Sequence, residues 1–97
     1  MRVVLSAVAT REFAVAVEWW RKNRPLAPTL LEDEMAALLE QLALAPLMGR
    51  SVLNNRLAGL RRASLEKSRY HLYYRVIEAR DLVWIARLWH MSRRPKR

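Results

Sequence analysis

Basic side chains and two histidines are the residues of this chain that can do chemistry, and they gather in its second half. A guanidinium offers five hydrogen-bond donors in a rigid fork that suits phosphates and carboxylates. An imidazole can take up or release a proton near neutral pH. The residues that combine these chemistries at short spacing are Arg61 and Arg62, then Lys67 and Arg69, then His90 with Arg93 and Arg94. Their types predict contacts with an anionic partner.

The charge of the chain is divided unevenly between its two halves. Residues 1–49 hold five basic and six acidic residues, a net charge of −1, whereas residues 50–97 hold thirteen basic and three acidic residues, a net charge of +10. Eleven of those thirteen basic residues are arginines. Such a surplus attracts nucleic acid or an acidic protein. Residues 94–97 either contribute to this basic surface or form a disordered end.

Length and composition restrict the class of protein. The 97 residues, 53% of them hydrophobic, suffice for a single compact domain over residues 1–97 and are too apolar for a disordered basic chain. The absence of cysteine excludes disulfides and thiolate metal sites, and His71 and His90 are too far apart in the sequence to suggest a metal site. No signal peptide and no membrane-length apolar run is present. We expect a cytoplasmic domain without metal or cofactor.

The beginning of the chain predicts a short strand followed by a helix. Residues 2–5 favour the strand, and Ser6, or else Thr10, is the expected N-cap of the helix. Apolar residues then recur at helical spacing from Ala9 to Trp20, and Pro25 pushes the residue before it out of the helical region. The first helix is therefore expected to end just before this proline.

A second helix is predicted to follow a short turn and to form an antiparallel hairpin with the first. Thr29 and Glu32 have the spacing of a capping box at its start, and Pro46 closes it. The adjacent Trp19 and Trp20 cannot both face the core from one helix, so one of them is expected to meet a partner or to stay half-exposed. The residues predicted to build the helical side of the core are Phe13, Trp20, Met35, Leu38 and Leu42.

After Gly49 the hydrophobic pattern changes from helical to alternating spacing. Residues 60–65, 70–77 and 82–90 predict three strands, with a hairpin turn at 78–81. Strict alternation in the last strand places on one face Val83, Ile85, Arg87 and Trp89, and on the other Leu82, Trp84, Ala86, Leu88 and His90. The predicted fold class is α+β in the order β-α-α-β-β-β: a helical hairpin packed on one face of a small, mainly antiparallel sheet.

Most aromatic residues of these strands are interpreted as sheet packing, because strands favour aromatic side chains generally. The same reasoning makes His71 a residue of the strand surface rather than a general base. His90 remains open to either interpretation, since a basic cluster follows it directly.

Three segments of the second half carry the most specific pattern of the chain. They are Arg61-Arg62-Ala63-Ser64-Leu65, Tyr70-His71-Leu72-Tyr73-Tyr74-Arg75-Val76 and Leu88-Trp89-His90-Met91-Ser92-Arg93. In this order they resemble the RelE/ParE superfamily of bacterial toxins, and within it the ParE-like, plasmid-stabilisation branch. The strand-helix-helix order and the loop from Pro46 to Gly49 are also similar, so the resemblance covers nearly the whole chain.

The resemblance implies a toxin of a type II toxin–antitoxin pair that arrests growth. Such a toxin is neutralised by a small acidic antitoxin whose carboxy-terminal segment wraps it, and the charge of residues 50–97 fits that partner independently. Two activities occur in the superfamily: ParE-like members poison DNA gyrase, and RelE-like members cleave mRNA on the ribosome. The implied partners are thus the antitoxin and either gyrase or the ribosome with its mRNA, without a membrane.

The residues favour a gyrase-poisoning binding protein over an endoribonuclease. Glu66 stands where the resemblance leads us to expect a catalytic arginine, and a carboxylate repels the phosphate that an arginine would hold. No tyrosine follows Arg93. In the alternative, RNA-cleaving interpretation, His90 would act as acid or base and Arg93 would hold a phosphate. We expect the following residues to face the target or the antitoxin: Arg61, Arg62, Lys67, Arg69, His90, Arg93 and Arg94.

Overall fold

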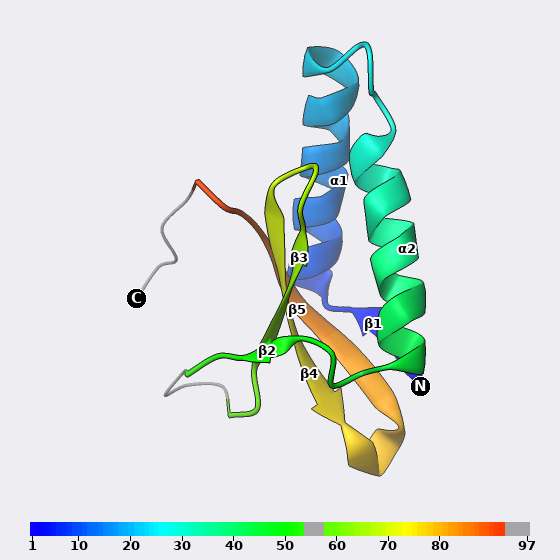
Figure 1. Cartoon of the computed structure of the whole chain (residues 1–97), viewed down its shortest axis with the longest axis vertical. Coiled ribbons are helices and arrows are strands. Elements are labelled where there is room, and N and C mark those ends of the chain that lie inside the picture. The colour runs from blue at the N-terminus through cyan, green and yellow to red at the C-terminus, as the bar shows by residue number, and fades with distance from the viewer. Residues whose placement is uncertain (54–57, 93–97) are drawn as a thin grey trace.

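The computed structural model, which describes residues 1–53 and 58–92, has two helices packed on a five-stranded mixed sheet (Figure 1). The strand order is β1-β5-β4-β3-β2, with β1 parallel to β5 and the other neighbours antiparallel. This confirms the predicted α+β class and its order, to which the structure adds the two-residue strand β2. The elements are β1 (Arg2–Leu5), α1 (Ala7–Asn23), α2 (Leu30–Leu44), β2 (Arg50–Ser51), β3 (Arg61–Leu65), β4 (Tyr70–Ile77) and β5 (Leu82–His90).

Both helices begin at the predicted N-cap residues, but the start of α2 lacks the predicted capping hydrogen bonds. The hydroxyl of Ser6 accepts a hydrogen bond from the backbone N–H of Ala9 at 3.0 Å, as an N-cap should. The predicted capping box at Thr29 is wrong. The backbone of Thr29 is not extended (φ −105°, ψ 7°), and its hydroxyl bonds to Asp33 instead of a helix N–H. Glu32, which should complete the box, is held by the guanidinium of Arg21.

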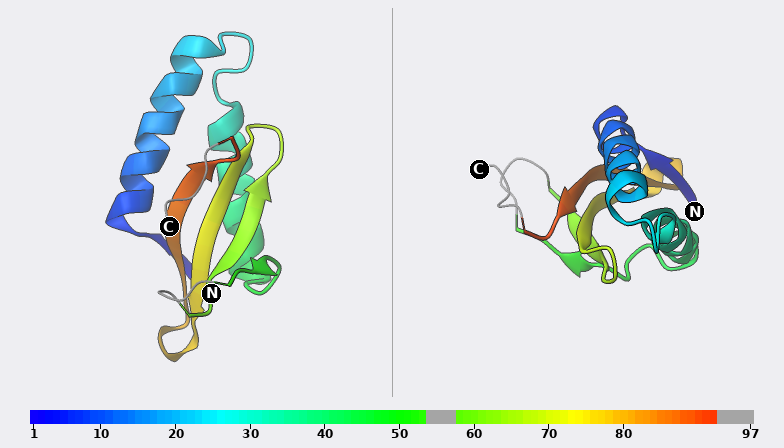
Figure 2. Two further views of the ribbon diagram at one scale, coloured as in Figure 1. Left: turned by 90° about the vertical axis from the view of Figure 1, so that its left-hand side faces the viewer. Right: turned by 90° about the horizontal axis from the view of Figure 1, so that it is seen from above.

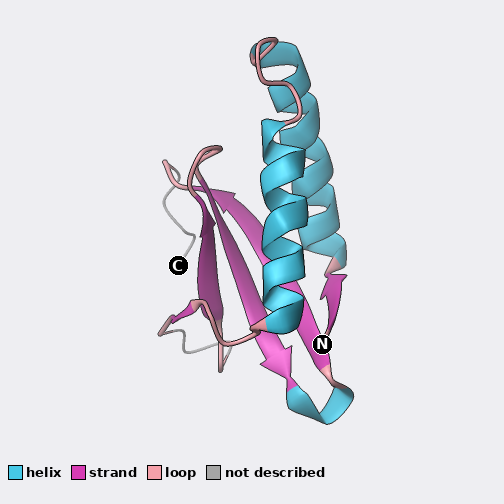
Figure 3. Ribbon diagram, turned by 45° about the vertical axis from the view of Figure 1, so that its right-hand side comes forward, coloured by secondary structure: helices cyan, strands magenta, loops and turns pink. Residues whose placement is uncertain are grey.

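The helical hairpin covers one face of the sheet and leaves the other bare (Figures 1 and 3). Of the two adjacent tryptophans, Trp20 is buried in this interface whereas Trp19 stays 46% exposed. Phe13 is partly buried and packs against the core. The other predicted helical core residues, Met35, Leu38 and Leu42, are all buried. Most of the predicted helical core is thus confirmed, and we call the uncovered side of the sheet the open face.

Strand β5 contains an irregularity that the alternating pattern does not predict. Tyr73 pairs with Arg87 but its neighbour Tyr74 pairs with Ile85, so Ala86 is an extra residue without a partner in β4. Ile85 and Leu88 consequently both point into the core and are both buried. The strict alternation predicted for residues 82–90 is therefore wrong beyond Ala86. The bulge sends Trp89 to the open face and His90 to the helix side.

Two further properties bear on function. No helix within the described residues is long and apolar enough to cross a membrane. The described residues also contain no group of three or more His, Cys, Asp or Glu side chains that could hold a metal ion.

Candidate interaction surfaces

The open face of the sheet is basic and aromatic. None of the strands in the described ranges contains an acidic residue. Figure 2 (left) looks onto this face, across β5, β4, β3 and β2. By strand register, it carries Arg62 and Ser64 from β3, His71, Tyr73 and Arg75 from β4, and Trp84 and Trp89 from β5. Its composition suits an anionic partner.

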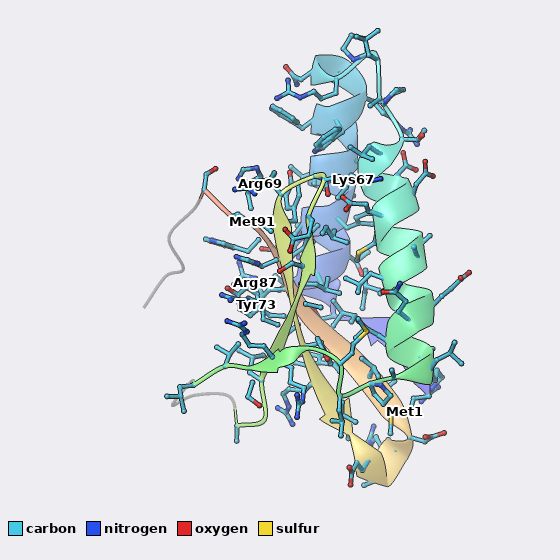
Figure 4. All side chains as sticks on the ribbon, viewed as in Figure 1. Met1, Lys67, Arg69, Tyr73, Arg87 and Met91 are labelled. Carbon is cyan, nitrogen blue, oxygen red and sulfur yellow. The ribbon has the colours of Figure 1, made fainter. Side chains whose placement is uncertain are left out.

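Arginines lie against the tryptophans of this face. The guanidinium carbon of Arg75 is 6.0 Å from the ring centre of Trp84, and that of Arg87 is 5.0 Å from the ring centre of Trp89. Such cation–π contacts hold both partners in place. The guanidinium of Arg87 is also bound by the carboxylate of Glu12, whereas none of the ion pairs among the described residues involves Arg75. Tyr73, Arg69, Arg87 and Met91 lie on this side of the sheet in Figure 4.

His71 sits in a more specific environment than the sequence suggests. Its Nδ1 lies 3.2 Å from the hydroxyl of Ser64 on the neighbouring strand. Burial lowers the pKa of the imidazole below its ordinary value, and the positive charges of Arg62 and Arg69 lower it further, although Glu66 opposes them. The ring is therefore neutral at pH 7. A neutral imidazole can accept a proton or a hydrogen bond, which the prediction of a plain surface residue did not include.

His90 points to the other side of the sheet. It pairs with Tyr70 in the ladder, and their rings meet edge to face with centres 5.0 Å apart. Its Nδ1 accepts a hydrogen bond from the backbone N–H of Ser92 at 3.1 Å. His71, by contrast, pairs with Trp89 on the open face. The two histidines of the chain thus project from opposite faces of the sheet.

The turn between β3 and β4 is held by a carboxylate from α2. Glu34 accepts hydrogen bonds from the backbone N–H of Lys67 at 3.0 Å and of Ser68 at 2.7 Å, and from the Ser68 hydroxyl at 2.6 Å. Burial alone would raise the pKa of Glu34, but the hydrogen bonds from Ser68 and Lys67 outweigh it and lower that pKa below its ordinary value. This anchor fixes the positions from which Lys67 and Arg69 project.

The predicted binding residues divide between the two ends of the sheet. At one end the turn between β3 and β4 carries Lys67 and Arg69, and it brings Arg69 next to the end of β5, because the backbone carbonyl of Arg69 accepts from the N–H of Met91 at 2.9 Å. Lys67 points toward the helices and Arg69 toward the open face (Figure 4). Arg61 and Arg62 start strand β3 at the opposite end. Arg93 and Arg94 lie outside the described residues.

Arg61 is engaged within the fold. Its guanidinium donates hydrogen bonds to the carbonyl oxygens of Gly49 at 2.6 Å and Leu47 at 3.2 Å. It therefore holds the loop that leads into β2, whereas its neighbour Arg62 shares the open face with Tyr73. The two adjacent arginines have different surroundings because successive side chains of a strand point to opposite faces.

A groove of about 540 Å³ separates α1 from the carboxyl end of β5. Strand β1 pairs with β5 only as far as Ile85, so beyond it this edge of β5 has no strand neighbour among residues 1–53 and 58–92. Glu12 of α1 covers part of this edge: it accepts from the backbone N–H of Leu88 at 3.0 Å and forms an ion pair with Arg87 at 2.6 Å. Its hydrogen bonds raise the pKa of Arg87 above the ordinary value. The groove is lined mainly by Val15, Ala16, Trp19, Tyr70, Leu88 and His90.

Residues that the sequence analysis did not select position these surfaces. Glu34 receives backbone N–H groups from the distant turn between β3 and β4, and Glu12 receives one from the distant strand β5. Neither has a sequence signal beyond lying on a helix, because the partner depends on how the helix is placed. The open-face group on β4 did have a signal: His71, Tyr73 and Arg75 occupy alternate positions of one predicted strand.

The arrangement of a five-stranded sheet with a helical hairpin on one face also occurs in solved structures of toxin–antitoxin systems. The intact E. coli RelBE toxin–antitoxin complex contains a chain that is 18% identical, with 95% of this chain and 98% of that chain covered and a TM-score of 0.63. The isolated E. coli RelE toxin is also 18% identical, with 96% of this chain and 86% of that chain covered and a TM-score of 0.64. A chain of the chromosomal ParDE toxin–antitoxin system from P. aeruginosa is 15% identical, with 95% of this chain and 97% of that chain covered and a TM-score of 0.65. At such identities these likenesses show the fold.

The family follows from the sequence itself. Residues 3–95 match the family model described as the ParE toxin of the type II toxin–antitoxin system parDE. The chain therefore belongs to this family and is a type II toxin of the RelE/ParE superfamily. Among curated proteins no sequence matches this chain.

Proposed function

We propose that this toxin acts in the cytoplasm by binding and inhibiting DNA gyrase, and that a small acidic antitoxin neutralises it. The observation that carries the choice of gyrase is the placement of His71 and His90 on opposite faces of the sheet. Membership of the ParE toxin family supports the same choice, since ParE-like members poison gyrase.

Metal-free RNA cleavage benefits from a base that activates the ribose hydroxyl and an acid that protonates the leaving oxygen. The two groups must reach the same phosphate from either side. His71 and His90 are separated by the sheet, so they cannot form such a pair. Glu66 adds an exposed carboxylate at the turn. These features support binding of a target rather than hydrolysis of one.

The groove beside α1 is the surface that we assign to the antitoxin. It combines an apolar lining with the half-exposed ring of Trp19 and an edge of β5 with which none of the described strands pairs beyond Ile85. An extended segment can lie along such an edge and seat apolar side chains beside it. The net positive charge of the chain favours a bound segment that also carries carboxylates.

Inducible expression separates the possible targets. We expect growth arrest with DNA-damage signalling and trapped gyrase–DNA complexes, while transcripts stay intact. Co-expression of the protein encoded beside this gene should restore growth and co-purify with the toxin. Rapid transcript cleavage without trapped gyrase would contradict the gyrase proposal, and absence of growth arrest would contradict toxicity altogether.

Ribosome-dependent mRNA cleavage is the second candidate, and the environment of His71 favours it. The neutral imidazole beside Ser64 can act as a general base, and Arg62 on the same face can hold a phosphate. If this candidate holds, His71→Ala abolishes transcript cleavage and leaves the unfolding midpoint unchanged. His90→Ala and Arg93→Ala test the assignment made from the sequence in the same assay.

A further inference from the structure

A second pocket lies at the opposite end of the open face from His71, where β4 and β5 meet their connecting turn. Its volume is about 330 Å³, and it is lined by Arg75, Ile77, Arg80, Leu82 and Trp84. We propose that this pocket, here the Arg75–Arg80 pocket, binds an acidic protein segment. One large apolar side chain of that segment sits on the pocket floor, and neighbouring carboxylates bind the two guanidiniums.

The floor of the pocket is apolar and extends beyond it. Leu82 is 8% exposed and Trp84 is half-buried. Packing therefore holds both side chains in place, while part of each lines the pocket. Val4 of β1 pairs with Trp84 in parallel register and remains 39% exposed, which continues the same floor onto the next strand. When an apolar side chain of the partner covers this floor, its own apolar surface and that of the floor are both removed from water.

Arginines surround this floor. Arg75 and Arg80 line the pocket, and Arg2 pairs with Leu82 on the same face. None of the ion pairs in residues 1–53 and 58–92 involves these guanidiniums. The nearest carboxylates in the sequence are those of Glu78 and Asp81 in the connecting turn, and both residues are exposed. The guanidinium forks are therefore available for the carboxylates of a partner.

The side chains that form the floor of the pocket favour a peptide over a nucleic acid. Bases bind single-stranded nucleic-acid sites by stacking on open aromatic rings. Here the ring of Trp84 already has the guanidinium of Arg75 at 6.0 Å, and the rest of the floor is aliphatic. Aliphatic and partly covered surface suits an apolar side chain. The proposal does not depend on whether gyrase or the ribosome is the target.

Fluorescence polarisation on the purified toxin tests the pocket at an ionic strength of about 0.15 M, where long-range attraction is screened. The probe is a labelled peptide with the sequence Asp-Glu-Phe-Leu-Asp-Glu. Its uncharged counterpart Asn-Gln-Phe-Leu-Asn-Gln and an oligothymidine of the same length are the comparison ligands. We expect the acidic peptide to bind more tightly than either.

The variant Arg75→Gln/Arg80→Gln removes both guanidiniums that bind the peptide carboxylates. We expect it to weaken peptide binding about tenfold, which corresponds to about 1.4 kcal/mol. Arg50→Gln removes the same type of charge from β2, away from the pocket, and should change binding less than about twofold by the same conversion. Val4→Glu places a carboxylate on the exposed floor and should abolish binding while the circular dichroism spectrum stays unchanged.

Three results would overturn the proposal. An equal loss in Arg50→Gln would mean general electrostatic attraction instead of a pocket. Tighter binding of oligothymidine, with the same sensitivity to Arg75→Gln/Arg80→Gln, would make the pocket a nucleic-acid site. Unchanged binding in a folded Val4→Glu variant would show that the apolar floor does not contact the peptide. Because gyrase is absent from the assay, these failures are distinct from failure of the proposed function.

Discussion

The phenolic hydroxyl of Tyr74 accepts a hydrogen bond from the backbone N–H of Gly49 at 2.8 Å, across 25 residues of sequence. The same hydroxyl donates to the carbonyl oxygen of Pro46 at 2.8 Å. Burial raises the pKa of this phenol, although the bond from Gly49 and the charge of Arg61 oppose the rise. Together Tyr74 and Arg61 hold the loop between α2 and β2 against the sheet, and thereby complete the edge of the open face.

Tyr74→Phe is expected to destabilise the toxin by about 1–3 kcal/mol, because it leaves the buried N–H of Gly49 and the partly buried carbonyl of Pro46 without their partner. Urea unfolding of the variant measures the change. Tyr73→Phe is the matched control, since Tyr73 lies on the open face and should lose less than about 0.5 kcal/mol. Equal losses in the two variants would show that the hydroxyl of Tyr74 has no special role.

Gly49→Ala is predicted to disturb the same loop for a steric reason. A Cβ atom at Gly49 would lie 2.5 Å from the hydroxyl of Tyr74 and 2.9 Å from the carbonyl oxygen of Arg62. The carbonyl is backbone and cannot move away without shifting β3. We expect a loss of about 1–3 kcal/mol, as for overpacking in a core. Gly59→Ala would add a Cβ that meets no atom, but there a positive φ of 75° adds strain, so it is no suitable control.

Stability should fall at low pH through the titration of Glu34. Its folded pKa is below the unfolded one, so the folded state favours the charged carboxylate. The stabilising effect is present above the unfolded pKa, near 4.3, and is lost as the pH falls through the folded pKa. Urea unfolding between pH 3 and pH 7 should show this decline in the native chain.

Glu34→Gln should flatten that pH dependence and cost about 1 kcal/mol at pH 7, since an amide retains only one acceptor oxygen for three donors. Glu40→Gln, on the exposed side of the same helix, is the control and should leave the profile unchanged. A native pH profile in Glu34→Gln would refute the role assigned to this anchor.

Glu12→Gln should loosen the edge of β5. The carboxylate binds both the backbone N–H of Leu88 and the guanidinium of Arg87, and the neutral amide cannot do both equally well. We expect faster hydrogen exchange at the amide of Leu88, with little change at Leu72 in the neighbouring strand. Exchange followed by NMR measures both. An unchanged rate at Leu88 would contradict protection of this edge by Glu12.

Leu38→Ala and Trp19→Ala are expected to separate folding from antitoxin binding. Leu38 is 6% exposed and its truncation should cost about 2–4 kcal/mol of stability. Trp19 is 46% exposed and lines the groove, so its truncation should cost less than about 1 kcal/mol but weaken antitoxin binding about tenfold or more. Calorimetric titration with the antitoxin checks this, and undiminished affinity in Trp19→Ala would place the antitoxin elsewhere.

The amino-acid sequence by itself determined the two helices, the strands β1, β3, β4 and β5, and the family. Apolar spacing located both helices, and alternation placed His71, Tyr73 and Arg75 on one side of β4, because these periodicities are properties of the local backbone. The same reasoning failed where other side chains compete for the groups that it pairs. At Thr29, Asp33 takes the hydroxyl and Arg21 takes Glu32, so no capping box forms.

The tertiary structure alone decided how these parts meet. The bulge at Ala86 depends on the pairing of β4 with β5, and it places Leu88 in the core and His90 on the helix side. The contacts of Glu12 with β5 and of Glu34 with the turn between β3 and β4 likewise exist only once the helices are packed. Sequence patterns record which side chains share a face, whereas the partner of a carboxylate and the register of two strands follow from packing of the whole chain.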